Sequence, residues 1–157
     1  MPMDDRQAME RALDLAREAA KLGEVPVGAV AVKDGVVVGE AFNRRETDRD
    51  PLAHAELLAL AQAARRLDAW RLTGVALYVT LEPCAMCAGA LIQARVSRLV
   101  FAARDPKSGA VGSLYDLARD ARHNHRVEVT AGVMEEESAA LLRDFFRALR
   151  GKRGTTE

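Results

Sequence analysis

Cysteine is rare in this chain: Cys84 and Cys87 are the only two among 157 residues. Two cysteines so close together cannot form the disulfide framework that stabilises many small secreted domains. In a reducing compartment such a pair instead indicates metal binding or redox chemistry. The shortage of cysteine therefore argues against a disulfide-stabilised extracellular protein.

The sequence also lacks long apolar runs and a recognisable export signal. Its longest apolar stretches, such as residues 75–81 and 88–92, are far shorter than the roughly 18 residues that a membrane span requires. The first residues, MPMDDR, are acidic where a signal peptide would be basic. We expect a cytoplasmic protein without membrane association.

A net charge is absent as well, because 23 lysine and arginine residues balance 23 aspartate and glutamate residues. The chain therefore has no overall positive field of the kind that marks proteins coating nucleic acids. Any RNA contact must come from a local patch. One candidate is the basic end of the last predicted helix, with a solvated helix end as the alternative; it contains Arg143, Arg147, Arg150, Lys152 and Arg153.

The apolar pattern predicts one domain over residues 1–150, followed by a flexible basic tail over 151–157. A type I′ turn at Asp34-Gly35 predicts a hairpin. Ser113 is a candidate cap for a short helix. Strands are expected at 27–33, 36–42, 75–81, 98–102 and 126–130, and helices at 4–22, about 51–67, 84–94, 113–119 and 135–150. This order predicts an α/β fold with a five-stranded mixed sheet covered by helices on both faces.

Two short motifs carry the chemistry, and each stands at the first turn of a predicted helix. His54 opens one motif, and Cys84 and Cys87 belong to the other. Zinc favours tetrahedral nitrogen and sulfur ligands, and a catalytic zinc keeps three protein ligands and one open position. A helix N-terminus stabilises the thiolate form of cysteine, which is the form that binds metal. We therefore predict a catalytic zinc site.

Glu56 distinguishes a catalytic site from a structural one. Two positions after His54, its side chain points in a different direction on the helix, so the two are not expected to be adjacent ligands. A hydrolytic zinc site needs a base beside a water molecule whose pKa the metal lowers to about 7. Glu56 is therefore the predicted general base.

Two other interpretations of the cysteine pair stay open. A redox pair leaves His54 and Glu56 without a role. A closed structural zinc site, with His123 or His125 as its fourth ligand, leaves Glu56 unexplained.

The two motifs, HAE at 54–56 and PCAMC at 83–87, resemble the signature of the zinc-dependent nucleobase deaminases. Within that family the chain looks like the bacterial tRNA-specific adenosine deaminases over nearly its whole length. The segments that carry this resemblance are 24–30, 43–44, 50–51, 81–90, 104–109, 112–114, 124–127 and 144–147. The resemblance implies a three-layer α-β-α fold of the cytidine-deaminase type.

It also implies hydrolysis of the wobble adenosine in the anticodon stem-loop of an arginine tRNA to inosine, with release of ammonia. One zinc ion per subunit, and no organic cofactor, would be held by His54, Cys84 and Cys87. Glu56 would carry the proton, while Asn43 and the backbone of Ala55 would contact the base.

Further residues match family segments that hold the flipped base and its neighbours. They are Asp105, Lys107, Asn124, Phe145, Arg147 and Arg150. The resemblance also implies a homodimer, with the 84–94 helix and the Gly112 region near the interface and tRNA contacting both subunits.

Local alternatives accompany these assignments. Asn43 and Asp105 are also typical turn residues, and Phe145 lies on an apolar helix face that is typical of a core. Two other functions use the same motifs: a zinc deaminase of a free nucleobase such as guanine or cytosine, and a non-catalytic zinc-stabilised RNA-binding module.

Overall fold

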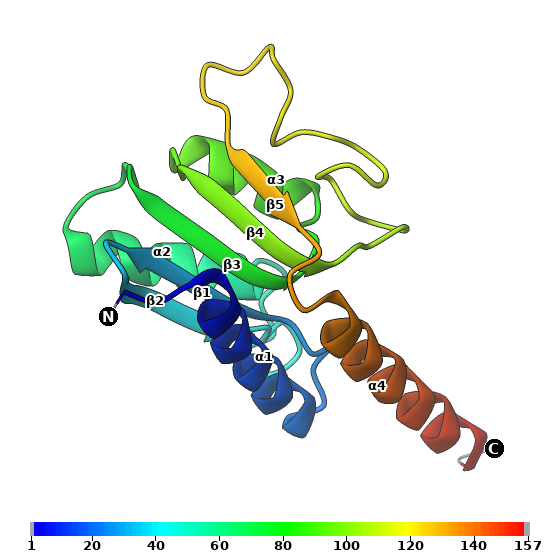
Figure 1. Cartoon of the computed structure of the whole chain (residues 1–157). Coiled ribbons are helices and arrows are strands. Elements are labelled where there is room, and N and C mark those ends of the chain that lie inside the picture. Colours follow the sequence, from blue (N-terminus) through cyan, green and yellow to red (C-terminus); the bar gives the residue numbers. More distant parts are fainter. Residues whose placement is uncertain (1, 156–157) are drawn as a thin grey trace.

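The computed structural model describes residues 2–155 as a five-stranded mixed sheet with helices on both faces (Figure 1). The elements follow in the order α1 (Asp5–Lys21), β1 (Gly28–Lys33), β2 (Val36–Phe42), α2 (Ala55–Leu67), β3 (Val75–Leu81), α3 (Ala85–Gln93), β4 (Arg98–Ala103), β5 (Glu128–Ala131) and α4 (Glu135–Thr155). In the sheet the strand order is β2-β1-β3-β4-β5. β1 is antiparallel to both neighbours, whereas β3, β4 and β5 are parallel.

Alternate residues of the central strands supply two separate cores. On β1, Ala29 and Ala31 pack with residues of α2 and α3, whereas Val30 and Val32 pack with residues of α1. This alternation follows from the two-residue period of a strand. It confirms the predicted three-layer arrangement, with α1 on one face of the sheet and α2 and α3 on the other.

Two glycines let the helices approach the sheet closely. A Cβ atom on Gly28 would lie 2.0 Å from the carbonyl oxygen of Ala12 in α1. On the other face, a Cβ atom on Gly39 would lie 2.3 Å from the carbonyl oxygen of Ala59 in α2. Only a residue without a side chain fits at either contact, so both helices can pack directly against the strand backbone.

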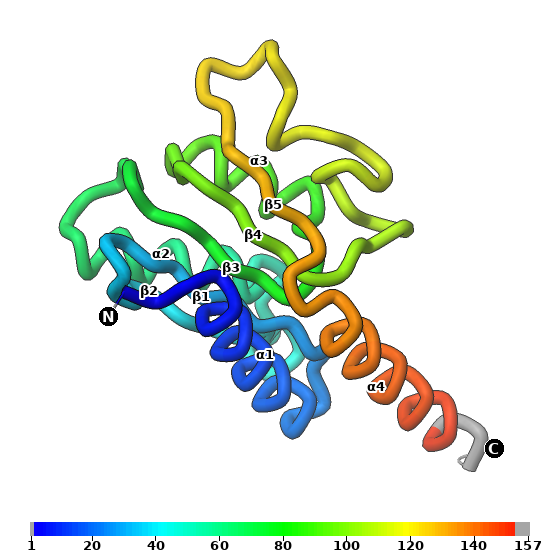
Figure 2. The backbone as a smooth tube through the Cα atoms, viewed as in Figure 1, coloured from blue at the N-terminus to red at the C-terminus, as the bar shows by residue number. Residues whose placement is uncertain are grey.

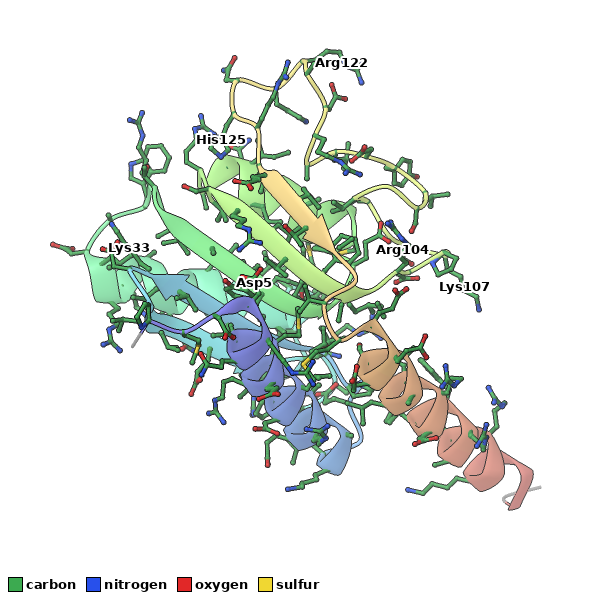
Figure 3. All side chains as sticks on the ribbon, in the orientation of Figure 1. Asp5, Lys33, Arg104, Lys107, Arg122 and His125 are labelled. Atoms are coloured by element: carbon green, nitrogen blue, oxygen red, sulfur yellow. The ribbon has the colours of Figure 1, made fainter. Side chains whose placement is uncertain are left out.

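A polar network fixes the start of α1 to the parallel part of the sheet. Asp5 accepts two hydrogen bonds of 2.7 Å from the Arg98 guanidinium and one of 2.8 Å from the Tyr78 hydroxyl. Arg98 also donates to Thr130 of β5. The Arg98 hydrogen bond lowers the pKa of Asp5, and burial, reinforced by the Asp5 carboxylate, raises the pKa of Tyr78 to about 12. Figure 3 labels Asp5 at the start of this helix.

The predicted hairpin is confirmed, because Asp34 and Gly35 both have the positive φ angles that a type I′ turn requires.

The predicted helix at 113–119 is wrong. Ser113 donates both its backbone N–H and its hydroxyl to Glu82, so its side chain does not cap a helix. Residues 104–127 instead form a long irregular connection between β4 and β5 (Figure 2).

The last helix extends further than expected. α4 continues to Thr155, so residues 151–155 are helical rather than an irregular tail. Residues 156–157 and the side chain of Arg153 lie outside the part of the chain that the structure describes. Within residues 2–155, no helix combines the length and apolar character needed to cross a membrane.

Candidate active site

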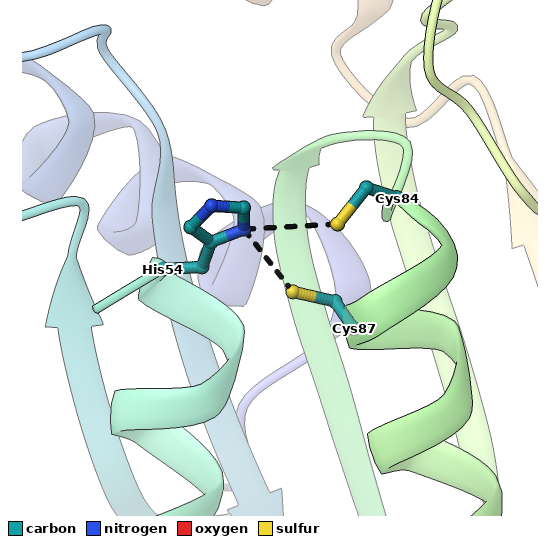
Figure 4. A group of neighbouring side chains, drawn as sticks. All are labelled: His54, Cys84 and Cys87. Atoms are coloured by element: carbon teal, nitrogen blue, oxygen red, sulfur yellow. Dashed lines mark hydrogen bonds between the residues drawn. The ribbon is translucent and has the colours of Figure 1, made fainter. Parts of the chain in front are cut away.

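The predicted metal ligands converge from the N-terminal ends of two helices that cover the same face of the sheet (Figure 4). His54 immediately precedes α2, Cys84 immediately precedes α3, and Cys87 lies in the first turn of α3. The parallel strands β3 and β4 end nearby, so the site lies at the carboxyl edge of the parallel strands. This is the edge at which open α/β sheets bind their ligands.

The geometry fits zinc. Nδ1 of His54 lies 3.7 Å from Sγ of Cys84 and 3.4 Å from Sγ of Cys87. Zinc–sulfur and zinc–nitrogen bonds at a tetrahedral angle would separate these atom types by about 3.6 Å. Within the described residues these three side chains form the group whose ligand atoms all lie within 4.8 Å of one another. One nitrogen and two sulfurs leave a fourth position for water or substrate, so the donor set suits a catalytic zinc.

The surroundings favour the metal-binding thiolate form at one of the two cysteines. A hydrogen bond from Cys87, together with the neighbouring His54, lowers the pKa of Cys84 to about 4 despite its partial burial. The same hydrogen bond, with burial, raises the pKa of the Cys87 thiol. The thiolate form of Cys84 is therefore favoured, whereas Cys87 would have to lose its proton on binding a metal ion.

Glu56 lies beside the ligands without belonging to their group. It occupies the first turn of α2, and its side chain is only 4% exposed. Burial raises the pKa of its carboxyl group, which also interacts with the thiol of Cys87. A carboxyl group with a raised pKa holds a proton more readily than an exposed one, which suits a group that must take up a proton and return it. The structure thus brings the predicted base next to the predicted metal site.

These residues open into a pocket of about 310 Å³, within the range of about 300–1,000 Å³ typical of small-ligand sites. Its walls come from the segments before β1, after β2, at the start of α2 and after β3 and β4. The lining residues are Val25, Val27, Asn43, Arg45, His54, Ala55, Glu56, Leu81, Glu82, Cys84, Asp105 and Ser108. Three residues predicted to contact substrate, Asn43, Ala55 and Asp105, therefore share one pocket with two of the predicted metal ligands, His54 and Cys84.

Asn43 and Asp105 also shape their own loops, as the alternative interpretation expected. Asn43 donates to the carbonyl oxygen of Val25 and accepts from the N–H of Arg45. Asp105 accepts from the N–H groups of Lys107 and Ser108. A turn-forming role and a place in the pocket wall are thus combined at both residues. Ala55 is the first residue of α2, where backbone N–H groups have no partner within the helix.

A second, basic groove lies beside the pocket. Asp105 and Ser108 line the pocket, while Lys107 between them lines this groove of about 400 Å³. Its other walls come from α4, at Leu142, Arg143, Phe146, Arg147 and Arg150. The predicted residues Lys107, Arg147 and Arg150 therefore lie together.

Phe145 is half-buried and makes an edge-to-face contact with Phe146, with ring centroids 5.4 Å apart. It is not among the residues that line the groove. The C-terminal half of α4 extends away from the sheet (Figure 2), and Leu141, Leu142 and Leu149 on the same face are also only half-buried. This face is not the closed core that its apolar pattern suggests.

Asn124 is not brought to the pocket of its own chain. It is exposed, and its neighbour His125 hydrogen-bonds through Nε2 to the carbonyl oxygen of Val96, just before β4. Asp105 follows the other end of β4, so Asn124 and the pocket lie at opposite ends of this strand. In Figure 3, His125 and Lys107 likewise lie far apart.

Two buried acids at the site were not predicted from the sequence. Glu24 is 1% exposed and accepts hydrogen bonds from the N–H groups of Glu46 and Thr47 in the loop after Asn43. Glu82 is 2% exposed and binds the loop that contains Asp105. The signal available for Glu82 was an acid placed directly between an apolar strand and the Pro83-Cys84 turn. Its partners lie too far along the chain for that signal to reveal them.

Comparison with known proteins identifies the family. A family model described as MafB19-like deaminase matches residues 3–150. A tRNA-specific adenosine deaminase of Bacillus subtilis is 48% identical over 149 residues, which cover 95% of this chain and 92% of that protein. The chain belongs to the tRNA-specific adenosine deaminase family. The Haemophilus influenzae member is also 48% identical, over 93% of this chain and 85% of its own length.

Solved structures agree with this family and its fold. A structure from a study of A-to-I editing by wobble-position tRNA deaminases superposes with a TM-score of 0.83 at 45% identity, covering 86% of this chain and 98% of that one. A guanine deaminase from Nitrosomonas europaea gives a TM-score of 0.77 at 28% identity, covering 89% and 83%. The predicted deaminase fold is confirmed, and the family relationship accounts for the pairing of HAE with PCAMC.

Proposed function

We propose that this deaminase hydrolyses the wobble adenosine of a tRNA anticodon, most readily that of an arginine tRNA, to inosine and ammonia. The observation that carries the proposal is the grouping of His54, Cys84 and Cys87 beside a pocket whose wall includes the buried Glu56. The 48% identity to tRNA-specific adenosine deaminases supports the choice of substrate. We place the reaction in the cytoplasm, with one zinc ion per subunit and no organic cofactor.

The chain's own residues divide the chemistry. His54, Cys84 and Cys87 would hold the zinc ion, which when bound makes water nucleophilic near neutral pH. Glu56 would accept one proton from the attacking water and donate it to the ring nitrogen of the base. It would then carry the second proton, from the new hydroxyl group, to the departing amine. The carbon–nitrogen bond to the amino group breaks as a carbon–oxygen bond forms, so adenosine and water become inosine and ammonia.

Base recognition would come from the pocket wall. The amide of Asn43 would donate or accept hydrogen bonds with a purine, the backbone N–H of Ala55 would donate one, and Asp105, also in the pocket wall, would accept one from a ribose hydroxyl. A pocket of about 310 Å³ is large enough for a purine base. Because a stacked base hides its reacting carbon, the substrate nucleotide must leave its stack, which costs less in a hairpin loop than in a duplex.

The basic groove would hold the neighbouring phosphates. Lys107, Arg143, Arg147 and Arg150 surround it, and their positive charge is local in a chain with no net charge. Such a patch supplies the phosphate contacts that a neutral RNA-binding protein needs. We include Phe145 among the positions that border the bound RNA.

A homodimer would complete the site. Leu114 and Tyr115, next to Gly112, are 55% and 54% exposed, and Leu52 near the pocket is 57% exposed. Exposed apolar surface of this kind is a candidate for an interface between subunits. A second copy against this region and α3 would also explain how Asn124, remote from its own pocket, could contact substrate. We expect sedimentation to give twice the 17.1 kDa chain mass, and a monomer at micromolar concentration would contradict the dimer.

The substrate is tested by measuring inosine in a synthetic arginine-tRNA anticodon stem-loop, beside free adenine, adenosine, guanine and cytosine. Zinc is measured on the same preparation. We expect conversion of the stem-loop alone, with about one zinc per chain. Turnover of a free base alone would keep the deaminase chemistry and overturn the tRNA substrate; binding of the stem-loop without turnover would favour a non-catalytic module.

A further inference from the structure

A buried carboxylate stands between the metal-ligand turn and the long loop after β4. Glu82 follows β3 and precedes Pro83 and Cys84, and it is only 2% exposed. It is not one of the three metal-ligand side chains, and it has no role in the reaction described above. An ionised group at this depth needs compensating partners, because burial alone would favour its neutral form.

All of its recorded partners lie in the loop 105–113. Oε1 accepts a 3.1 Å hydrogen bond from the N–H of Asp105, and Oε2 accepts bonds of 2.9 and 3.1 Å from the N–H groups of Val111 and Ser113. The hydroxyl of Ser113 donates to Oε1. Burial opposes ionisation, but these four donors outweigh it and lower the pKa of Glu82.

The loop is fitted closely around this carboxylate. A Cβ atom on Gly109 would lie 2.4 Å from both Cδ and Oε2 of Glu82. Gly109 also forms a bridge with Cys84, and the N–H of Ala110 donates to the carbonyl oxygen of Pro83 at 2.8 Å. The turn that supplies a metal ligand therefore also anchors the loop.

This loop provides one wall of the pocket and one wall of the basic groove, through Asp105 and Lys107 respectively. We propose that Glu82 is a positioning residue that fixes this loop at the pocket rim and thereby sets the affinity for the RNA substrate, without taking part in proton transfer. The proposal rests on the proposed function for its substrate. The claim that Glu82 fixes the loop does not depend on the substrate.

Glu82→Gln is the sharpest test, because glutamine has the same shape but replaces one acceptor oxygen with an NH₂ group. In one orientation that group faces the N–H groups of Val111 and Ser113; in the other it faces the N–H of Asp105. Either way at least one backbone donor meets another donor. We expect KM for the stem-loop to rise about tenfold, with kcat within about threefold of wild type and zinc retained.

Hydrogen exchange gives a readout that needs no substrate. The amides of Asp105, Val111 and Ser113 should be protected in the wild type and should exchange at least tenfold faster in Glu82→Gln. Asp5→Asn is the matched control, since that hydrogen-bonded carboxylate fixes α1 to the sheet and not the loop. It should lower thermal stability while leaving KM unchanged.

Three outcomes would overturn the proposal: unchanged KM with unchanged exchange, a fall in kcat at constant KM, or loss of zinc. If Glu82→Gln does not fold, Ser113→Ala provides the test, because it removes only one hydrogen-bond donor to Glu82. We expect a two- to fivefold rise in KM for this variant, and an unchanged KM would refute the proposal. If the wild type converts only a free base, the proposed substrate fails separately. The exchange experiment still tests the loop.

Discussion

Glu56→Gln should lower kcat for inosine formation by about 10²–10⁴-fold while zinc content and thermal stability stay near those of the wild type. Glutamine keeps the shape of the side chain, so the buried first turn of α2 is not disturbed. It cannot accept and return a proton, so the chemical step loses its carrier. Single-turnover kinetics on the anticodon stem-loop would measure this loss apart from binding.

The matched control is Glu18→Gln, an exposed acid on α1 that is paired with Lys21 and remote from the pocket. Its kcat should equal that of the wild type. If Glu56→Gln kept full turnover, Glu56 would not be the proton carrier. If it kept turnover and also lost zinc, the assignment of the metal ligands would need revision too.

Removal of zinc by a chelator should abolish deamination and lower the melting temperature by about 10 °C. The ligands come from two helix N-termini, and His54 lies 30 positions before Cys84. A metal ion that binds only the folded state at about a thousand times its Kd stabilises that state by about 4 kcal/mol. For a domain of this size each kcal/mol corresponds to roughly 2–4 °C.

Calorimetry and activity measured before chelation, after it and after zinc is restored would test this. Cys87→Ser, at a fully buried ligand, should reproduce the chelated state and should not recover with added zinc. Full activity with less than about a tenth of an equivalent of zinc per chain would contradict the metal's role.

Features set by neighbouring residues could be predicted from the sequence. The Asp34-Gly35 turn fixes its hairpin locally, and the bounds of β3 follow from a mainly apolar run closed by Glu82-Pro83. The nearness of Cys84 and Cys87 could be predicted for a similar reason, since they lie on one helical turn, while their assignment as zinc ligands stays a prediction. His54 joins them through tertiary structure, and the motif resemblance supplied that connection.

Features set by distant partners could not be predicted. Ser113 has the chemistry of a helix cap, but its donors are taken by Glu82, 31 positions earlier. Glu24 likewise finds its partners more than 20 positions away, in the loop after Asn43. The sequence shows that such residues are polar and gives no sign that they are buried.

The order of the site residues along the chain has a consequence for engineering. The metal ligands, Glu56 and the pocket residue Asn43 all lie within residues 43–87, whereas the basic groove is built from residues 107–150. Under the proposed function, the residues for hydrolysis and the residues for contacting the surrounding RNA thus lie in successive halves of the chain. A chimera that keeps the first half and exchanges the second, joined within β4, should change which RNA is accepted while the reaction stays the same.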